Sequence, residues 1–233
     1  MKTHAFVFAR GGSKGIPHKN IHILEGKPLL AWSIEMAMSL PEIDRVFVST
    51  DDLKIGEVAR AWDAEVITRP TELAKDDAPE WLAWQHAVRE VQNMSGEFDR
   101  FLSLPATSPL RRQSDVQSCL DALNKQTDIV VSITEAAHSP WFNMVTIEED
   151  SSLKLLFNSD YRRRQDVPLA FNITTVAYVT RPSFILNHSG IWSGIIYGVK
   201  VPRERAVDID SSFDLRVAEI LMQEQVDKRA VQC

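Results

Sequence analysis

The chain is poor in cysteine and lacks any long hydrophobic run. Cys119 and Cys233 are its two cysteines, too few for the disulfide framework that supports small secreted domains. No apolar stretch approaches the roughly 20 residues that a membrane-spanning helix needs, and the apolar residues 6–9 are too few for the core of a signal peptide. We therefore expect a cytoplasmic protein with no membrane partner.

Positive charge is not in excess either. The net charge of −6 at pH 7 argues against a protein that grips nucleic-acid phosphates through its overall field, so we expect no nucleic-acid partner. The six histidines are scattered without the spacing of metal ligands. With 233 residues, of which 44% are hydrophobic, the chain can bury a sizeable core, and we expect a single domain over 1–233.

Glycine is scarce as well, but three of the nine glycines fall within residues 11–15. The apolar residues 4–9 predict a buried first strand that leads directly into this loop, which also carries Arg10, Lys14 and Lys19. Because glycine tolerates positive φ, we expect the loop N–H groups to form an anion-binding nest, and three cations suit a triphosphate. The spacing matches neither a P-loop nor the dinucleotide fingerprint. A solvated turn whose lysines face water is the alternative.

The longer pattern over residues 9–20, Ala-Arg-Gly-Gly-Ser-Lys-Gly-Ile-Pro-His-Lys-Asn, resembles the nucleotide loop of a known family. That family is the CMP-sialic acid synthetases, or acylneuraminate cytidylyltransferases, with their nonulosonic-acid relatives. Four further segments follow in the family's order: 48–51, 69–74, 106–111 and 207–210. The resemblance implies transfer of CMP from CTP to the anomeric hydroxyl of a nonulosonic acid, with release of pyrophosphate, by a homodimer.

Alternating strands and helices predict the fold class. We expect an α/β fold with a Rossmann-like, mostly parallel sheet flanked by helices, of the nucleotide-diphospho-sugar transferase type. The expected strands are 4–9, 45–50, 64–67, 98–104, 128–133, 172–180 and 195–201, and the expected helices are 29–40, 55–62, 81–91, 114–125 and 213–225. In the last helix the apolar residues Phe213, Val217, Ile220 and Leu221 indicate an amphipathic helix. Between about 135 and 190 the alternation breaks, which predicts an inserted β-rich lobe; the resemblance implies that this lobe forms the dimer and helps to bind the sugar.

The first and last motifs supply the expected catalytic residues. Attack of a sugar hydroxyl on the α-phosphate of CTP depends on positioning and charge neutralisation. We expect Arg10, Lys14 and Lys19 to hold the triphosphate and to stabilise the leaving pyrophosphate. Asp208 and Asp210 lie two positions apart, so on an extended segment both carboxylates face the same side.

These two carboxylates match the metal-binding Asp-Ile-Asp of the family and suit Mg²⁺ (or Mn²⁺). Asp210 is expected to bind the metal directly, and Asp208 to bind it directly or through water, or to act as a base on the sugar hydroxyl. The alternative is that Asp210 or Ser211 merely caps the last helix.

The resemblance also implies which residues contact CTP. These are Ala9, Arg10, Gly11, Gly12, Ser13, Lys14, Lys19, Asn20, Arg69, Ala78 and Glu80. Arg69 matches the cytidine-site arginine of the family, and its alternative is an exposed ion pair with Glu72. Glu80 stands where the family often has serine.

The expected sugar site differs more from the family. The expected sugar-binding residues are Thr107, Ser108, Arg164, Gln165 and Asn172. An arginine of the sialic-acid enzymes is replaced in the segment around Asn172, so the arginine run 162–164 must meet the carboxylate of the sugar, unless that run is only a solvated surface. We therefore expect a legionaminate- or pseudaminate-type acceptor rather than N-acetylneuraminate. An eight-carbon 3-deoxy acid sugar as acceptor, or a nucleotide-binding protein without turnover, are the competing hypotheses.

Overall fold

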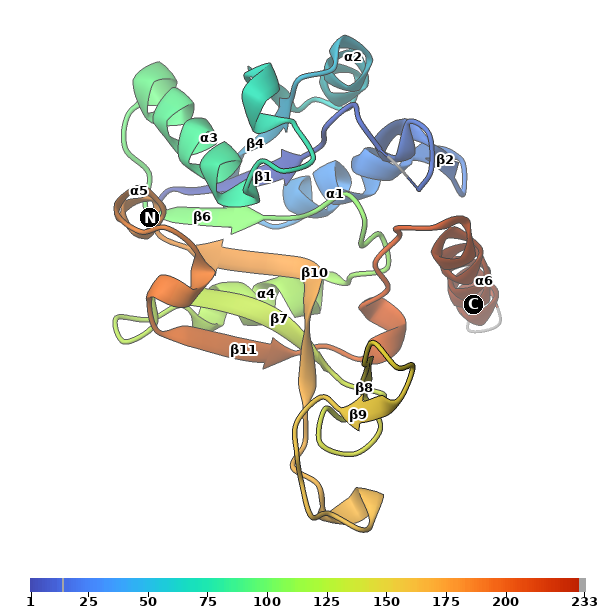
Figure 1. Cartoon of the computed structure of the whole chain (residues 1–233). Coiled ribbons are helices and arrows are strands. Elements are labelled where there is room, and N and C mark those ends of the chain that lie inside the picture. Colours follow the sequence, from blue (N-terminus) through green and yellow to red (C-terminus); the bar gives the residue numbers. More distant parts are fainter. Residues whose placement is uncertain (14, 231–233) are drawn as a thin grey trace.

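A seven-stranded sheet forms the centre of the protein. The computed structural model describes residues 1–13 and 15–230, and side chains as far as Glu224. The sheet has the strand order β11-β7-β10-β6-β1-β4-β5 (Figure 1). Its strands are β1 Thr3–Phe8, β4 Ile43–Thr50, β5 Glu65–Thr68, β6 Arg100–Ser103, β7 Ile129–Glu135, β10 Phe171–Thr180 and β11 Ile196–Lys200. All neighbouring strands are parallel except that β10 runs antiparallel to β6 and β7. The predicted α/β, mostly parallel sheet is confirmed; the reversed direction of β10 was not predicted.

Helices cover both faces of this sheet. The elements packed on one face are α1 Leu29–Met38, α2 Leu53–Ala61 and α4 Gln113–Ala122. The elements packed on the other are α3 Glu80–Ser95 and α5 Pro182–Asn187. Two small hairpins, β2 Ile23–Leu24 with β3 Lys27–Pro28 and β8 Val145–Ile147 with β9 Leu153–Leu155, lie outside the sheet. No described helix is long and apolar enough to cross a membrane.

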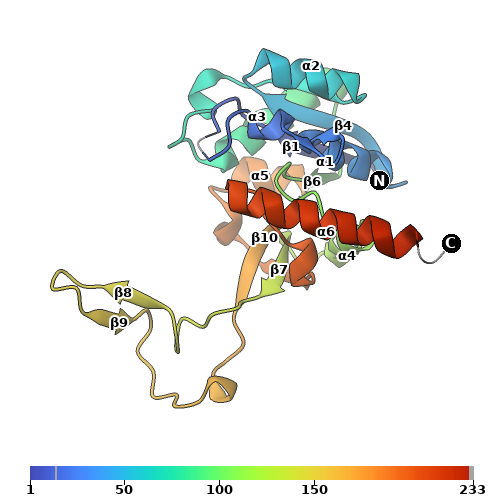
Figure 2. The ribbon, with the colours of Figure 1, turned by 90° about the vertical axis from the view of Figure 1, so that its right-hand side faces the viewer.

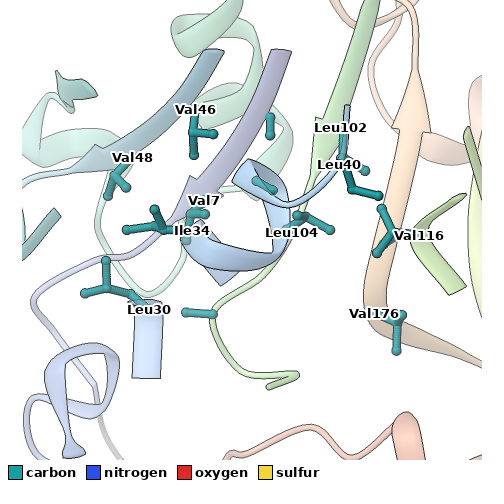
Figure 3. Close-up of a cluster of buried hydrophobic side chains, with 14 of the residues drawn as sticks. Val7, Leu30, Ile34, Leu40, Val46, Val48, Leu102, Leu104, Val116 and Val176 are labelled. Carbon is teal, nitrogen blue, oxygen red and sulfur yellow. The ribbon is translucent and has the colours of Figure 1, made fainter. Parts of the chain in front are cut away.

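The two faces of the sheet have different cores. Aliphatic side chains from β1, β4, α1 and α4 fill one, with Val7, Ile34 and Val48 fully buried (Figure 3). Aromatic rings dominate the other, where Phe6 stacks on Phe101 with ring centroids 4.4 Å apart. The tryptophan stripe of α3 belongs to this second core, as its helical spacing predicts. Each such buried side chain contributes about 1.5–3 kcal/mol of transfer free energy, so both faces hold the sheet rigid.

The parallel strands bring three predicted loops to one edge of the sheet. β1 ends at Phe8 and β4 at Thr50, and these strands pair in register. Beyond them the Ala9 N–H donates to the Ser49 carbonyl at 3.1 Å and the Gly11 N–H donates to Asp51 Oδ1 at 3.0 Å. Residue 104, just after β6, bonds back to β1, so the 105–111 segment starts at the same edge. Ligands of open α/β sheets bind at such an edge.

Residues 136–170, which we call the lobe, extend away from this body (Figures 1 and 2). Their regular structure is the β8–β9 hairpin and one short 3₁₀ turn, Arg164–Asp166. The expected lobe over 135–190 is therefore too long: β10 is a strand of the main sheet, and α5 packs against α3. Several large apolar side chains of the lobe face solvent, among them Ile147, Leu153 and Phe157.

The last helix, α6 Ser212–Ala230, packs on a face that its apolar residues predicted only in part, because Leu221 packs against the third apolar cluster but Phe213 and Ile220 do not. Phe213 is 64% and Ile220 58% exposed. Ala218 and Met222 are buried instead, in a third apolar cluster that includes Ile16 of the glycine loop. The helix therefore supports the loop and the Asp-Ile-Asp segment that precedes it.

Candidate active site

A cavity of about 480 Å³ opens at the carboxyl edge of β1, β5 and β6. Most of the residues predicted to bind nucleotide and metal line it. These are Arg10, Gly12, Ser13, Lys19, Asn20, Arg69, Ala78, Glu80, Asp208 and Asp210. Ala9 is fully buried behind the cavity wall, and the backbone of Gly11 is bonded to Asp51. The prediction for Lys14 lies outside the described residues.

The loop glycines are needed for close approach rather than for positive φ. Neither Gly11 nor Gly12 adopts a left-handed conformation, so the expected nest built on positive φ at these glycines is wrong. A Cβ on Gly11 would lie 2.8 Å from Asp52 Oδ2, and a Cβ on Gly15 would lie 2.1 Å from the backbone oxygen of Asp210. Glycine therefore lets the loop touch the end of β4 on one side and the Asp-Ile-Asp segment on the other.

The two described loop cations are held by acceptors around the cavity. Arg10 Nη1 lies 2.6 Å from Asp76 Oδ1 and also donates to the Ala74 carbonyl. Lys19 Nζ donates to Asp210 Oδ1 and to the Ile209 carbonyl, both at 2.8 Å. These ion pairs keep both cations beside the cavity, where phosphate oxygens can take over their hydrogen bonds.

Asn20 closes the loop from inside. Its side chain is buried, and its Nδ2 donates to the Arg10 carbonyl at 3.0 Å. The amide that was expected as a neutral nucleotide contact thus also fixes the backbone that carries Arg10.

The helix cap of α6 is separate from the two predicted metal ligands. Ser211 Oγ accepts from the Asp214 N–H at 3.4 Å, and Asp214 Oδ2 accepts from the Ser211 N–H at 2.8 Å. This reciprocal pair is a capping box, so Ser211 caps the helix. The Asp210 carboxylate is 73% exposed and is bonded to Lys19, which leaves it open for a ligand.

Asp208 carries a buried oxygen with no partner. Its Oδ1 is inaccessible to solvent and has no hydrogen-bond partner among the described residues. Burial, chiefly, and the neighbouring Asp210 raise the pKa of Asp208, while the hydroxyls of Thr107 and Thr175 oppose the shift. Hard carboxylate oxygens of this kind suit Mg²⁺. No group of three or more His, Cys, Asp and Glu side chains gathers anywhere in the described part of the chain, so the protein would offer two carboxylates.

Arg69 lies at the deep end of the cavity. Its side chain is only 6% exposed; Nη2 donates to the Ser49 carbonyl at 2.6 Å and Nε to Ser49 Oγ at 3.1 Å. The guanidinium also lies 5.5 Å from the centre of the Phe8 ring. The alternative of an exposed pair with Glu72 is therefore wrong.

Glu80 faces Arg69 from the first turn of α3. Its Oε1 accepts from the Trp84 indole N–H at 3.2 Å. Glu80 is exposed as a residue and its carboxylate opens onto the cavity; partial desolvation by the surrounding protein raises its pKa, and Trp84 and Arg69 oppose the shift. A hydrogen-bond donor and an acceptor thus meet at the deep end.

The expected sugar residues do not all meet at this cavity. Thr107 lines it, but Ser108 is fully buried and bonds Thr175 Oγ1 at 2.6 Å, so Ser108 supports the wall rather than contacting a ligand. Arg164 donates to the Ala137 carbonyl at the base of the lobe and lines a different cavity with Lys200 and Arg203. Gln165 and Asn172, both exposed, are not among the residues that line the main cavity.

Several lining residues were not predicted. They are Lys75, Asp76, Thr175 and Tyr178, together with Phe8, Gly15, Leu73, Ala83, Pro105 and Ala106. Thr175 and Tyr178 lie on β10, whose register with β7 shifts between Ile173 and Tyr178, so simple alternation along the strand does not identify them. In the sequence, the adjacent charged residues Lys75 and Asp76 follow Arg69 by six and seven positions. This closeness to a predicted binding residue could have indicated that they also line the cavity.

Arg111 is a buried cation that supports the wall. Its Nη1 donates to Ser33 Oγ at 2.6 Å, and its Nη2 to the carbonyls of Pro105 and Thr175. Burial lowers its pKa to about 9. These bonds join the 105–107 turn to β10 just below Asp208.

Residues 11–15 also have the Gly-x-Ser-x-Gly spacing of a hydrolase nucleophile elbow. None of the described residues that line the cavity is a histidine, so Ser13 has no general base there. A serine-hydrolase site does not fit this geometry.

Comparison with known proteins agrees with this site. The family model described as cytidylyltransferase matches residues 4–205. The chain is 30% identical over 224 residues to a pseudaminic acid cytidylyltransferase of Campylobacter jejuni, covering 95% of this chain and 96% of that protein. It is 26% identical to the post-translational flagellin modification protein B of Campylobacter coli, with 94% of each covered.

A vertebrate relative is longer. The chain is 33% identical to the N-acylneuraminate cytidylyltransferase B of Danio rerio over 92% of this chain, but it spans only half of that protein. Among solved structures, that of a CMP:2-keto-3-deoxy-manno-octonic acid synthetase complexed with CTP matches with a TM-score of 0.71 and 18% identity, covering 97% of this chain and all of the other; at this identity the match speaks for the fold alone. With the family match, the sequence relatives and the geometry of the cavity in agreement, the chain belongs to the cytidylyltransferase family.

Proposed function

We propose that this protein transfers CMP from CTP to the anomeric hydroxyl of a nonulosonic acid and releases pyrophosphate. The observation that carries the proposal is the meeting of Arg10 and Lys19 with Asp208 and Asp210 around one cavity, from ends of the chain about 190 residues apart. Relatives named for pseudaminic acid and N-acylneuraminate support the acceptor class.

The reaction assigns a role to each group. The anomeric oxygen of the acceptor forms a bond to the α-phosphorus, the bond from that phosphorus to the bridging oxygen breaks, and pyrophosphate leaves with the electron pair. Arg10 and Lys19 neutralise the charge that develops on the leaving group; Lys14 is expected to add to them. The proton of the sugar hydroxyl passes to the carboxylate of Asp208, which lines the cavity.

A divalent cation, Mg²⁺ or Mn²⁺, fits the two carboxylates. Asp210 is open to solvent beside Lys19, and Asp208 holds the unpaired oxygen, so these two side chains would hold it. When bound, the cation would supply positive charge that stabilises the negative charge of the phosphate groups during transfer.

The lobe supports a homodimer. Its outward-facing Ile147, Leu153 and Phe157 form an apolar surface that a second copy would bury. Arg164 and Gln165 of the lobe lie away from the cavity of their own chain, and an acidic sugar needs a cation for its carboxylate. We propose that these lobe residues complete the sugar site of the partner subunit.

The acceptor is proposed to be of the legionaminate or pseudaminate type. The support is the sequence around Asn172, which lacks one of the arginines expected in sialic-acid enzymes, and the similarity to a pseudaminic acid cytidylyltransferase. N-acetylneuraminate should therefore be used more slowly than at least one other nonulosonate.

Pyrophosphate release tests the proposal. CTP, Mg²⁺ and a panel of acid sugars are supplied: N-acetylneuraminate, its deaminated analogue, legionaminate, pseudaminate and 3-deoxy-manno-octulosonate. Release that needs both CTP and one nine-carbon acid is the expected result. Faster release with the eight-carbon acid would change the acceptor class, whereas CTP binding without release from any of them would favour a non-catalytic nucleotide-binding protein.

A further inference from the structure

The deep end of the cavity carries one donor and one acceptor side by side. Nε and Nη2 of Arg69 donate hydrogen bonds to Ser49, so the remaining N–H groups of the guanidinium can donate to a ligand. Oε1 of Glu80 accepts a hydrogen bond from the Trp84 indole, and the Glu80 side chain forms no other hydrogen bond within the described residues. Its Oε2 is therefore a free acceptor on the cavity wall.

An uncharged part of the substrates fits the end of the cavity that Arg69 and Glu80 line. The triphosphate and the acid sugar are both anionic, and the Glu80 carboxylate repels them. The cations Arg10 and Lys19 and the exposed Asp210 mark the open end of the cavity for the charged groups. Phe8, Ala78 and Ala83 add apolar surface near Arg69, which suits a flat, neutral base.

We infer that Glu80 selects cytosine by accepting a hydrogen bond from its exocyclic amino group. This inference rests on the proposed use of CTP and adds the residue that excludes UTP. Cytosine offers an acceptor at O2, an acceptor at N3 and a donor at its 4-amino group. The Arg69 donors match the first two and the Glu80 carboxylate matches the third; carboxylates pair with the cytosine amino group in this way elsewhere.

Uracil has the opposite pattern at two of these positions. Its O4 is an acceptor that faces the Glu80 carboxylate, and its N3–H faces the Arg69 donors. Two unpaired groups in a desolvated site cost far more than the loss of one contact. Glu80 thus acts against the wrong nucleotide as well as for the right one.

Glu80→Gln is the sharpest test because Trp84 controls the orientation of the new side chain. The indole N–H must still be accepted by Oε1, so the NH₂ group of the glutamine takes the place of Oε2. That group donates to O4 of uracil and opposes the amino group of cytosine. We expect the ratio of kcat/KM for CTP to that for UTP to fall about 30–100-fold, with the UTP value itself rising.

Glu80→Ala removes the hydrogen-bond acceptor, whereas Glu80→Gln replaces it with a donor, so the two variants distinguish these effects. This variant should lose CTP efficiency without gaining UTP efficiency. Glu72→Gln removes the same charge from a residue that does not line the cavity, and its ratio should stay within about twofold of the wild-type ratio. Calorimetric titration with CTP and with UTP, without acceptor, should repeat the pattern for all three variants.

Four outcomes decide the matter. A fall of the ratio in Glu80→Gln with a rise for UTP, and no change in Glu72→Gln, supports the inference. An unchanged CTP/UTP ratio in both Glu80 variants, with CTP still used, overturns the inference and leaves the proposed function standing. An equal shift in Glu72→Gln also overturns it, because a general charge effect would then explain the selectivity. Wild-type protein that neither binds nor uses CTP overturns the proposed function and this inference together.

Discussion

The residues around the cavity and those of the lobe are held in place by different kinds of contact. At the cavity, Lys19 is bonded to Asp210 across 191 positions of the chain, and Arg10 pairs with Asp76 from the far side of β4 and β5. In the lobe the arginine run makes a local pair, Arg163 with Asp166 three positions on. Long-range contacts hold the first region at the main cavity within a single chain, whereas no contact of the arginine run among the described residues brings it to that cavity.

The difference concerns burial as well. The loop and the Asp-Ile-Asp segment rest on Ile16 and Ile209, which are buried against α6. The apolar side chains of the lobe face solvent. The proposed nucleotide half of the site is therefore formed within a single chain, and the proposed sugar half depends on two.

The largest effect is expected at the nucleotide end, from Asp210→Asn. The neutral amide would weaken binding of the proposed cation, so kcat should fall about 100–1,000-fold. The side chain is mostly exposed, so thermal stability should hardly change.

Ser211→Ala is the matched control for Asp210→Asn. It removes the cap of α6, at about 1 kcal/mol, but touches no proposed ligand, so Tm should fall while turnover persists. Near-normal turnover by Asp210→Asn, measured as metal-dependent pyrophosphate release, would contradict the metal assignment.

The next effect tests whether the lobe serves the other subunit. Arg164→Ala should lower turnover about 10–100-fold and leave CTP binding unchanged, because the cation that meets the sugar carboxylate is lost. Mixing Arg164→Ala with Asp210→Asn should restore activity, since a mixed dimer has one intact site. With random pairing the recovery should reach about a quarter of the wild-type rate.

Refolding the two variants together and assaying pyrophosphate release gives the answer. Each variant refolded alone is the control. No recovery in a mixture shown to contain mixed dimers would mean that the lobe serves its own chain, and the contrast between the two regions would disappear.

A smaller effect is expected from Gly15→Ala. The added methyl group would lie 2.1 Å from the Asp210 backbone oxygen, so the loop must move away from the Asp-Ile-Asp segment. The KM for CTP should rise about tenfold, because the cations of the loop then lie out of place.

Gly12→Ala is the control, since a Cβ there meets nothing within 4 Å and the backbone is not left-handed; its Tm should match the wild type. Equal CTP affinity in Gly15→Ala would show that the loop is not held as tightly as its contacts indicate.

The same contrast explains what the sequence predicts well. The loop at residues 9–20 and the pair Asp208 and Asp210 are short motifs beside strongly patterned elements, so strand ends and their loops were placed correctly. The place of Arg69 at the cavity agrees with its position directly after β5. Features that depend on tertiary register were not predictable: Tyr178 reaches the cavity through an irregular register in β10.

The sequence also did not predict which side chains of α6 are buried, because the residues packed against the helix determine this. The apolar Phe213 and Ile220 of α6 suggest a buried face, but the partners offered by Ile16 and Leu110 select Ala218 and Met222 instead. The strand at 172–180 was predicted, but its pairing with β6 and β7 in the main sheet depends on tertiary contacts that the sequence pattern does not show. The boundary expected at residue 190 was wrong for that reason.

The smallest effect concerns the stability of the strand beneath the loop. His4 of β1 is buried, stacks on Phe98 at 4.7 Å between ring centroids, and has an Nδ1 without a hydrogen-bond partner. Burial lowers the pKa of His4 below its usual 6.5; Arg45 and Lys2 act in the same direction, and the Thr3 backbone and Asp44 oppose it. The unfolded chain therefore binds the proton more tightly than the folded one. The stabilisation that depends on neutral His4 is complete above about pH 6.5 and is lost as the pH falls below that value.

Urea unfolding at pH 7.5 and pH 5.5 measures this, with His4→Phe as the variant that keeps an aromatic ring but cannot titrate. The wild type should lose more free energy of unfolding between the two pH values than His4→Phe does, by on the order of 0.5 kcal/mol. The difference should appear equally in a protein whose lobe pairing is disrupted by Phe157→Glu, because His4 lies in the single-chain body. Identical pH dependence of the wild type and His4→Phe would mean that His4 has the same pKa in the folded and the unfolded chain. If the difference vanished in Phe157→Glu, the stability of the nucleotide end would depend on the second subunit, and the separation drawn between the two regions would fail.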